Sequence, residues 1–408
     1  MKVVIIGAGH AGGSAAALLR ASGFAGDIVL VGEDPWPPYQ RPPLSKAWLK
    51  GEAGLDALLL RPEAYYADHD IVLKTGIAAV SIQRGARAVT FSDGSAETYD
   101  ALILATGSTG RRLTVPGADR SDLITLRTVA DADRLKAQLG PGRRLVIVGG
   151  GYVGLEAAAS ATVLGTEVVL LERLDRVLKR VASEPLSVFF TARHRAAGVD
   201  IRTDTDLAAF EDGGVRLAAG ELVEADVVLV GIGAFANDGL ARKAGLDCDP
   251  SGSGGVIVDD QARTSDPAIY AIGDVTVRPI PVHGLSMRLE SVPNALEQAR
   301  QAARAIVGHA QEAPEVPWFW SEQYEAKLQI AGLPQGSDRM IVRGDPDTGR
   351  FGVFHLNCDR VVCVEAVNAP PEFMAGKQLI QRRIPVDATK LADPGVSMKA
   401  VASELCRG

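Results

Sequence analysis

Cysteine is scarce in this sequence, and its scarcity argues against a disulfide framework. Four cysteines occur among 408 residues, at positions 248, 358, 363 and 406. Cys358 and Cys363 are only five positions apart, but they lie in a strand-rich stretch, where buried small hydrophobic residues are favoured over metal ligands. So few and scattered cysteines are typical of a protein from a reducing compartment.

Long apolar runs, metal-ligand spacings and excess positive charge are lacking as well. No apolar run is long enough to span a membrane and no signal-peptide pattern precedes the first strand, so we expect a soluble, cytoplasmic chain. The six histidines form no HExxH or His/Cys array, and we expect no metal. The net charge of −7 disfavours nucleic-acid binding, although all of it lies before Trp318, since the later residues carry equal numbers of acids and bases.

The sequence does contain one pattern twice: an apolar strand, a glycine turn, an alanine-rich helix, a second apolar strand and an acid. The first copy runs from Val3 to Glu33 and the second from Leu145 to Glu172. The glycines of the two GxGxxG turns are Gly7, Gly9 and Gly12, then Gly149, Gly151 and Gly154. The first glycine permits the turn, the second lets the backbone approach a pyrophosphate, and the third allows close packing of helix on strand. Two dinucleotide sites are therefore predicted.

Each acid lies at a spacing suited to binding a ribose. Glu33 follows Gly12 by 21 residues and Glu172 follows Gly154 by 18. A carboxylate near this distance accepts hydrogen bonds from the ribose hydroxyls but repels a 2′-phosphate, so Glu172 favours NADH over NADPH. Arg173 and Arg176 weaken that expectation, because either could turn toward a phosphate.

Five further motifs follow one another along the chain. They are Tyr39–Lys46 (YQRPPLSK), Ala105–Gly107 (ATG), Tyr270–Asp274 (YAIGD), Glu290–Ala295 (ESVPNA) and Trp318–Tyr324 (WFWSEQY). Together with the glycine turns they resemble the FAD-dependent pyridine nucleotide reductases, in particular the ferredoxin reductases of bacterial oxygenase and cytochrome P450 systems. The resemblance extends over nearly the whole chain.

The resemblance implies an α/β fold of two Rossmann-like dinucleotide-binding domains, as in glutathione reductase, and a C-terminal α+β domain. The FAD domain would comprise residues 1–110 and 240–317, the NAD domain residues 111–239 and the C-terminal domain residues 318–408. The implied FAD-binding residues are Gly7, Gly9, Gly12, Glu33, Arg41, Lys46, Ala105, Thr106, Gly107, Asp274, Val292 and Trp320. The implied NAD-binding residues are Gly149, Gly151, Tyr152, Val153, Gly154, Glu156, Glu172 and Gly233.

Three residues are implied to be catalytic. In similar reductases a lysine at the position of Lys46 lies beside flavin N5 and pairs with a glutamate at the position of Glu156. Such a lysine favours the reduced, anionic flavin, and the carboxylate can orient the nicotinamide. The alternatives are a surface position for Lys46 and, for Glu156, a carboxylate that only complements a helix N-terminus. Trp320 would lie near the flavin and the electron exit, or else pack in the core of the third domain.

Related disulfide reductases carry a redox cysteine pair in the region of Pro42–Lys50, but this chain has no cysteine before Cys248. Electrons are therefore expected to leave from the flavin, which can accept a hydride and release electrons one at a time. The resemblance implies an NADH:ferredoxin oxidoreductase that reduces a [2Fe–2S] ferredoxin serving a cytochrome P450 or ring-hydroxylating oxygenase. The alternatives are a rubredoxin reductase, an NADH oxidase or peroxidase, and a non-enzymatic flavoprotein resembling apoptosis-inducing factor.

A ferredoxin is expected to dock where the C-terminal and FAD domains meet. Acidic ferredoxins would need a local basic surface on this acidic chain. The candidate residues are Arg339, Arg343, Lys377, Arg382 and Arg383.

Overall fold

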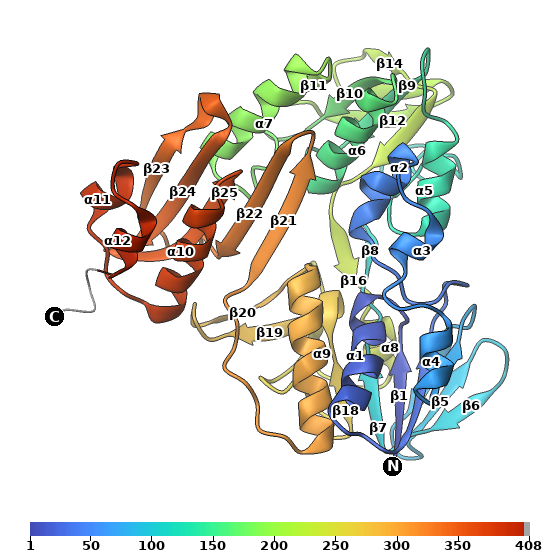
Figure 1. The fold of residues 1–408 in the computed structure, drawn as a ribbon. Coiled ribbons are helices and arrows are strands. Elements are labelled where there is room, and N and C mark those ends of the chain that lie inside the picture. The colour runs from blue at the N-terminus through green and yellow to red at the C-terminus, as the bar shows by residue number, and fades with distance from the viewer. Residues whose placement is uncertain (404–408) are drawn as a thin grey trace. The chain divides into compact units, whose positions relative to one another are not determined.

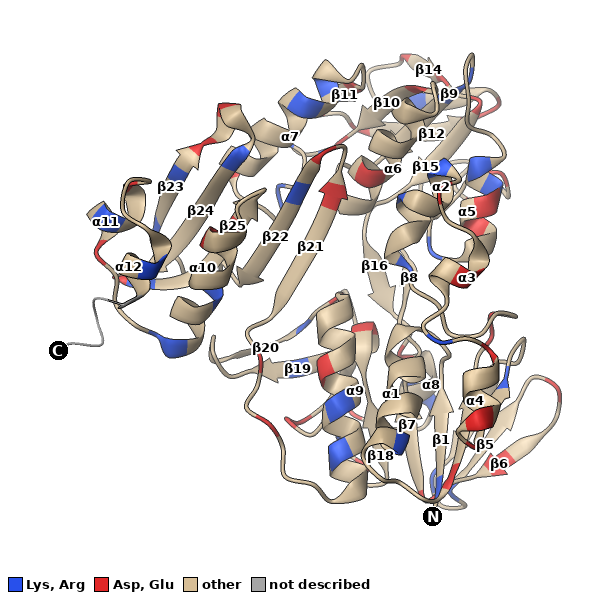
Figure 2. Ribbon diagram, in the orientation of Figure 1, with Lys and Arg blue, Asp and Glu red and all other residues tan. Residues whose placement is uncertain are grey.

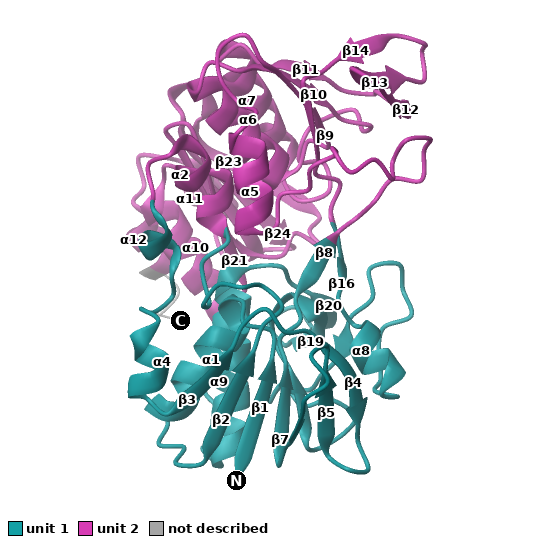
Figure 3. Ribbon diagram, turned by 90° about the vertical axis from the view of Figure 1, so that its right-hand side faces the viewer, with its two compact units in different colours: residues 1–41, 54–109, 234–315 teal, residues 42–53, 110–233, 316–408 magenta. Residues whose placement is uncertain are grey.

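The computed structural model describes residues 1–403 and confirms the expected α/β fold, with two parallel sheets and a five-stranded antiparallel sheet near the C-terminus (Figure 1). The chain divides into two compact units, neither of which is continuous in sequence (Figure 3). The first comprises residues 1–41, 54–109 and 234–315, and the second comprises residues 42–53, 110–233 and 316 onward. Lys46 therefore belongs to the same unit as the second glycine turn. Cys406 lies outside the described residues.

A five-stranded parallel sheet forms the centre of the first unit. Its strands in spatial order are β18 (Ile269–Ala271), β7 (Ala101–Leu104), β1 (Lys2–Ile6), β2 (Asp27–Val31) and β3 (Ile71–Lys74). Val3 and Ile5 enter one buried cluster, whereas Val4 and Ile6 enter another. Both faces of the sheet are thus covered, which explains the near-continuous apolar runs in its strands.

Helices α1 (His10–Ala21) and α9 (Val292–Val307) pack against each other in the first unit, and alanines from both helices enter the same buried cluster (Figure 1). The other buried cluster includes residues of the antiparallel sheet formed by β4 (Ala79–Gln83), β5 (Ala88–Phe91) and β6 (Ala96–Thr98). The remaining elements are α3 (Leu55–Leu58), α4 (Ala64–Asp68), β16 (Ala234–Ala236), α8 (Gly239–Lys243), β17 (Val256–Ile257), η2 (Gly273–Val275), β19 (Thr276–Ile280) and β20 (Leu285–Arg288).

A four-stranded parallel sheet organises the central part of the second unit. Its strands in spatial order are β11 (Asp200–Arg202), β10 (Glu167–Leu171), β9 (Arg144–Val148) and β15 (Val227–Val230). The associated elements are α5 (Val129–Lys136), α6 (Tyr152–Val163), α7 (Glu184–Ala196), β12 (Leu207–Glu211), β13 (Gly214–Leu217) and β14 (Leu222–Glu224). Ser108 and Thr109 of strand β8 (Ser108–Gly110) belong to the first unit.

The end of the chain forms a five-stranded antiparallel sheet. Its strands in spatial order are β21 (Trp318–Gln323), β22 (Ala326–Gly332), β25 (Arg360–Val367), β24 (Arg350–Asn357) and β23 (Arg339–Asp345). Three helices and a short turn, η3 (Pro346–Thr348), complete it, the helices being α10 (Pro370–Arg382), α11 (Ala388–Ala392) and α12 (Met398–Ser403). Leu155 and Phe190 of the central part share one buried cluster with Leu328 and Phe351 of this sheet. The two parts therefore form one compact unit.

The segment 42–53 is anchored in the second unit by its own side chains. It contains the turn η1 (Pro42–Ser45) and helix α2 (Ala47–Lys50). Leu49 is fully buried in the core of this unit, and Trp48 Nε1 donates a hydrogen bond of 2.9 Å to Asp133 of α5. These contacts fix the residue between the two elements, Lys46. Among the described residues, no helix has the length and apolarity that crossing a membrane requires.

Candidate active site

The first and third glycines of each turn are required by the chain itself. Gly7 and Gly149 have φ angles of +108° and +110°, which side chains on L-residues rarely tolerate. A Cβ at Gly12 would lie 1.9 Å from the carbonyl oxygen of Gly7, and one at Gly154 would lie 2.3 Å from that of Gly149. These glycines therefore let each helix pack directly on its turn.

The middle glycines meet no such constraint. Gly9 and Gly151 precede helices α1 and α6 with φ angles of −83° and −84°, which any residue adopts. A Cβ at either position would have no heavy atom within 4 Å. Neither position makes a side-chain cap, so the N–H groups of the helix N-termini face this open space. Space beside free N–H groups fits the pyrophosphate of a dinucleotide.

The two acids that follow the second strands differ in their surroundings. Glu33 is exposed after β2, whereas Glu172 is half-buried after β10. Glu172 accepts hydrogen bonds from the N–H of Gly150 at 2.7 Å and from the N–H of Leu174 at 2.8 Å. The second turn thus holds its acid in a fixed orientation.

The nearby arginines have separate roles. Arg176 donates hydrogen bonds to the carbonyls of Ala182 and Ser183 and to the hydroxyl of Ser187, so it holds the start of α7 and is not poised to turn toward a phosphate. Arg173 is exposed. Val153 is also exposed, beside Tyr152 at the start of α6.

Gly233, which follows β15, has a φ of +100°. A Cβ there would lie 3.6 Å from an Arg180 nitrogen and 3.7 Å from Arg111 Nε. Arg180 and Arg111 were not predicted from the sequence, because neither belongs to the glycine turn. Their positive charge suits a ligand with phosphates.

In the first unit, the ATG and YAIGD motifs lie beside the first turn. Ala105 follows β7 and is buried. The side-chain hydroxyl of Thr106 donates a hydrogen bond of 2.8 Å to the carbonyl of Asn237. Gly107 has a φ of +69°. Asp274 lies in η2 and accepts a hydrogen bond from the Ser108 hydroxyl at 3.1 Å. The Asp274 carboxylate is therefore held by Ser108, the residue that follows the ATG motif.

Three more residues complete the candidate FAD site. Val292 is the first residue of α9, and the guanidinium of Arg41 lies 5.5 Å from the centre of the Tyr39 ring. His10 begins α1 directly after Gly9 of the first turn. Its Nδ1 is buried without a hydrogen-bond partner in the described chain, and burial lowers the pKa of His10 to about 4, with a smaller opposing effect from Asp274.

The second unit brings Lys46 and Glu156 together. Lys46 Nζ lies 2.6 Å from Glu156 Oε2, and the Glu156 side chain is only 6% exposed. The same oxygen accepts a hydrogen bond of 2.6 Å from Ser45, and Oε1 accepts one of 2.7 Å from Ser321 of β21. The surface alternative for Lys46 is therefore wrong, and Glu156 does more than complement a helix N-terminus, because its carboxylate accepts from three side chains. The two serines were not predicted, although Ser45 adjoins Lys46 and Ser321 adjoins Trp320.

The aromatic residues of β21 alternate between its two faces. The Phe319 ring lies 4.6 Å from that of Tyr152, whereas the Trp318 and Trp320 rings lie 5.6 Å apart. Burial, followed by the charge of Glu365, raises the pKa of Tyr152 well above its usual value. Phe319 therefore packs toward α6, and half-buried Trp320 belongs to the other face.

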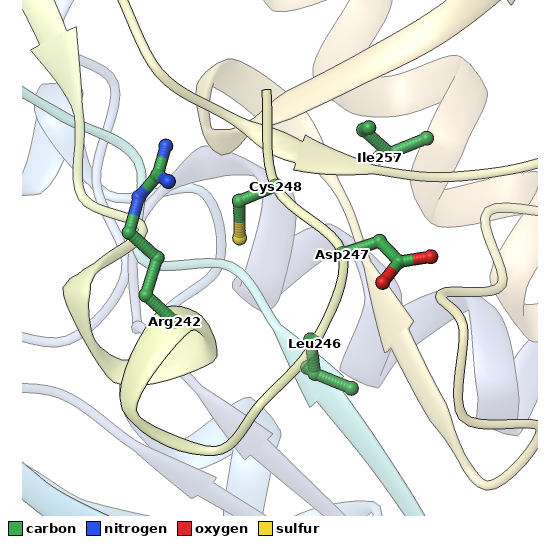
Figure 4. A pocket seen from close by; sticks show the side chains of 5 residues that line it. All are labelled: Arg242, Leu246, Asp247, Cys248 and Ile257. Atoms are coloured by element: carbon green, nitrogen blue, oxygen red, sulfur yellow. The ribbon is translucent and has the colours of Figure 1, made fainter. Parts of the chain in front are cut away.

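An open depression in the first unit contains none of the residues predicted from the sequence. Its volume is about 460 Å³, and its lining consists of Arg242, Leu246, Asp247, Cys248 and Ile257 (Figure 4). Burial raises the pKa of the Cys248 thiol, which disfavours the reactive thiolate. Within residues 1–403 no group of three or more His, Cys, Asp or Glu side chains is arranged to hold a metal ion.

Comparison with known proteins identifies the family. Residues 1–299 match the pyridine nucleotide-disulphide oxidoreductase family, and residues 318–402 match the reductase C-terminal family. The chain therefore belongs to the pyridine nucleotide-disulphide oxidoreductases, which use FAD and NAD(P)H. The open space beside Gly9 and Gly151 fits two such dinucleotides.

Three relatives narrow the comparison. The chain is 47% identical to the probable ferredoxin reductase CtmF of Castellaniella defragrans, over 98% of each chain. The solved covalent complex of putidaredoxin reductase with putidaredoxin contains a chain that is 42% identical, with a TM-score of 0.96 over 100% of this chain and 99% of that one. A rubredoxin-NAD(+) reductase of Pseudomonas putida is less similar, at 38% identity over 91% of this chain and 96% of that protein.

Proposed function

We propose that this chain is an NADH-dependent ferredoxin reductase that passes electrons singly to a [2Fe–2S] ferredoxin, which in turn serves a cytochrome P450 or ring-hydroxylating oxygenase. The main support is that two dinucleotide turns accompany a partly buried Lys46–Glu156 pair in a chain without a cysteine before Cys248. The higher similarity to ferredoxin reductases favours this function over rubredoxin reduction. We also propose that the reaction occurs in the cytoplasm, where NADH is supplied.

The first unit would hold FAD. The N–H groups at the start of α1 and the open space beside Gly9 suit the pyrophosphate, while exposed Glu33 suits a ribose. Asp274, oriented by Ser108, would accept hydrogen bonds from FAD hydroxyls. The implied residues Arg41, Ala105, Thr106, Gly107 and Val292 would complete the site.

The second unit would hold NADH against the N-terminus of α6. Glu172 would accept hydrogen bonds from the adenine ribose, and Tyr152, Val153 and Gly233 would line the site. When bound, FAD supplies an acceptor for the hydride and a source of single electrons. Lys46 would place a positive charge near the flavin, and Glu156 would keep that ammonium in position. Trp320 would lie on the path by which electrons leave.

One experiment separates the candidate activities. Purified protein should be yellow, should release FAD on denaturation, and should be reduced by NADH without oxygen. Reoxidation should be faster with an acidic [2Fe–2S] ferredoxin than with rubredoxin, O2 or peroxide. Faster reoxidation by any of the other three acceptors would assign the chain to that class, and release of FMN or a covalently held flavin would refute the first site.

We further propose that the ferredoxin docks at a basic end of the C-terminal sheet. Arg382 and Arg383 are exposed where α10 ends, and Pro385 pairs with Arg360 at the β24–β25 hairpin. Figure 2 shows Lys and Arg positions of the C-terminal sheet and its helices in blue. Two of the basic residues suggested by the sequence have other roles. Arg343 is 3% exposed and donates hydrogen bonds to the carbonyls of Leu391, Asp393 and Val396, and Lys377 lies over the Trp318 ring.

Charge reversal tests this surface. Arg382→Glu combined with Arg383→Glu should slow ferredoxin reduction about tenfold at low salt, since steering depends on local charge, and the difference should shrink as salt rises. Reduction of ferricyanide by NADH should not change. Arg87→Glu with Lys243→Glu, at exposed residues of the other unit, makes the same change in net charge and should leave ferredoxin turnover intact. Equal losses in both double variants would show that net charge matters and the α10 end does not.

A further inference from the structure

The Glu156 carboxylate is one end of a buried chain of polar side chains in the second unit. Ser321, which donates to Glu156, accepts a hydrogen bond of 3.2 Å from Gln323 Nε2. Gln323 Oε1 lies 2.9 Å from His194 Nε2, and His194 Nδ1 lies 3.3 Å from the Tyr324 hydroxyl. Ser321, Gln323 and His194 are each at most 1% exposed. Polar groups at such depth are costly unless each finds a partner.

The Glu156 carboxylate sets the direction of every hydrogen bond in this series of side chains. Ser321 has one hydroxyl proton and gives it to Glu156, so it can only accept from Gln323. The Gln323 amide must then present its oxygen to His194, whose Nε2 carries a proton and donates. Nδ1 of His194 is left to accept from Tyr324. Burial lowers the pKa of His194 to about 4, so the imidazole stays neutral and keeps this single tautomer.

This series of hydrogen bonds is suited to orienting the side chains and not to transferring a proton. The side-chain amide of Gln323 stands between Ser321 and His194, and an amide does not readily take up one proton while releasing another. What the amide does is fix the rotation of the Ser321 hydroxyl. His194 comes from α7, while Gln323 and Ser321 come from β21, so the hydrogen bonds also hold the strand in register against the helices.

We infer that Ser321, Gln323 and His194 are positioning residues that hold the Glu156 carboxylate directed at Lys46, and thereby support the reduction of bound flavin by NADH. This inference rests on the proposed role of the Lys46–Glu156 pair. Ser321 supplies one of three side-chain donors to the carboxylate, the others being Ser45 and Lys46.

Other titratable groups surround Glu156. Lys46 precedes α2, and Tyr152 lies one turn earlier on α6, where its pKa is raised by burial and by the charges of Glu365, Cys363 and Glu156. His194 stands at the far end of the polar chain, in α7. A tyrosine with a raised pKa and a histidine with a lowered one stay neutral near pH 7, so Lys46 is the charged group that opposes the carboxylate.

The test measures the rate of flavin reduction by NADH in the FAD-loaded protein, together with the flavin midpoint potential. Ser321→Ala removes one of the three side-chain donors that orient the Glu156 carboxylate toward Lys46. The rate should fall about tenfold, the worth of one hydrogen bond to a charged group, and the midpoint potential should shift with it. Gln323→Met should change the rate and the potential less, in the same direction. Ser321→Thr, which keeps the hydroxyl, should retain the wild-type rate and potential.

Two further variants make the outcome decisive. Ser187→Ala removes a buried serine hydroxyl of α7 that bonds to Val177 and Arg176, and it should leave the rate and the potential at their wild-type values. Glu156→Gln should slow reduction at least as much as Ser321→Ala. If Glu156→Gln does so while Ser321→Ala and Gln323→Met leave the rate and the potential at their wild-type values, the inference fails and the proposed function stands. A Glu156→Gln protein with the wild-type rate would refute the proposed role of the pair itself.

Discussion

The two glycine turns have nearly the same backbone, yet their surroundings differ. Their first glycines have φ angles of +108° and +110°, and each turn leads into a helix of 12 residues. The fifth residue of the helix is Ser14 in the first copy and Glu156 in the second. The acid after the next strand is exposed in the first copy and bonded to backbone amides in the second. The turn is thus a general dinucleotide cradle, and the residues around it determine the chemistry.

The largest effects are expected from filling each cradle in turn. Gly9→Ala and Gly151→Ala place a methyl group in space that the chain leaves open, so the ligand-free proteins should melt like the wild type. A misplaced methyl group against a bound ligand costs roughly 1–3 kcal/mol, or up to about 100-fold in affinity. Gly9→Ala should weaken FAD binding, and Gly151→Ala should weaken NADH binding while FAD stays bound. A Gly9→Ala protein with wild-type FAD affinity would contradict the assignment of the first turn.

A smaller effect should follow from removing the charge that faces Glu156. Lys46→Met should slow flavin reduction by NADH about 10- to 100-fold and lower the flavin potential, because a preorganised positive charge is lost. Stopped-flow measurement and FAD content are the readouts, and FAD should remain bound. Lys50→Met, four residues away in the same segment, removes a lysine paired with exposed Glu52 and serves as the matched control. Similar rates for both variants and the wild type would leave Lys46 without a role in hydride transfer.

The smallest effect is expected on the preference for NADH over NADPH, which we assign to Glu172. The wild type should have a higher kcat/KM with NADH than with NADPH, and Glu172→Arg should reduce that ratio about tenfold, since a charged hydrogen bond contributes roughly 1.5–3 kcal/mol. Glu172→Gln retains an acceptor for the Gly150 N–H and separates the effect of charge from that of turn geometry. A wild-type protein that uses NADPH equally well would overturn the preference.

The sequence predicted those features that depend on local backbone geometry. The glycine turns, their strands and the helices that follow them depend on short-range rules, and helices α1 and α6 begin directly after Gly9 and Gly151. The pairing of Lys46 with Glu156 was available only through the resemblance, because 110 residues separate them. The partners Ser45 and Ser321 were missed, since a serine has no pattern that reveals its burial against a carboxylate.

Surface assignments were the least predictable from sequence. Arg343 looks like any other arginine on a strand, but in the fold it is buried and bonds to carbonyls near the C-terminus. Arg176 likewise serves the start of α7. Whether an arginine faces solvent or caps a helix depends on tertiary contacts that have no short-range signature.

The discontinuity of the two units has a consequence for synthesis on the ribosome. The chain passes from one unit to the other five times before it ends. Glu156 emerges 165 residues ahead of Ser321, a delay of roughly 10 to 30 s at typical elongation rates. During that interval the carboxylate lacks a hydrogen-bond donor that it has in the finished protein, and the strand that supplies it does not yet exist. The nascent second unit should therefore remain loosely packed around α6 until the last quarter of the chain is made.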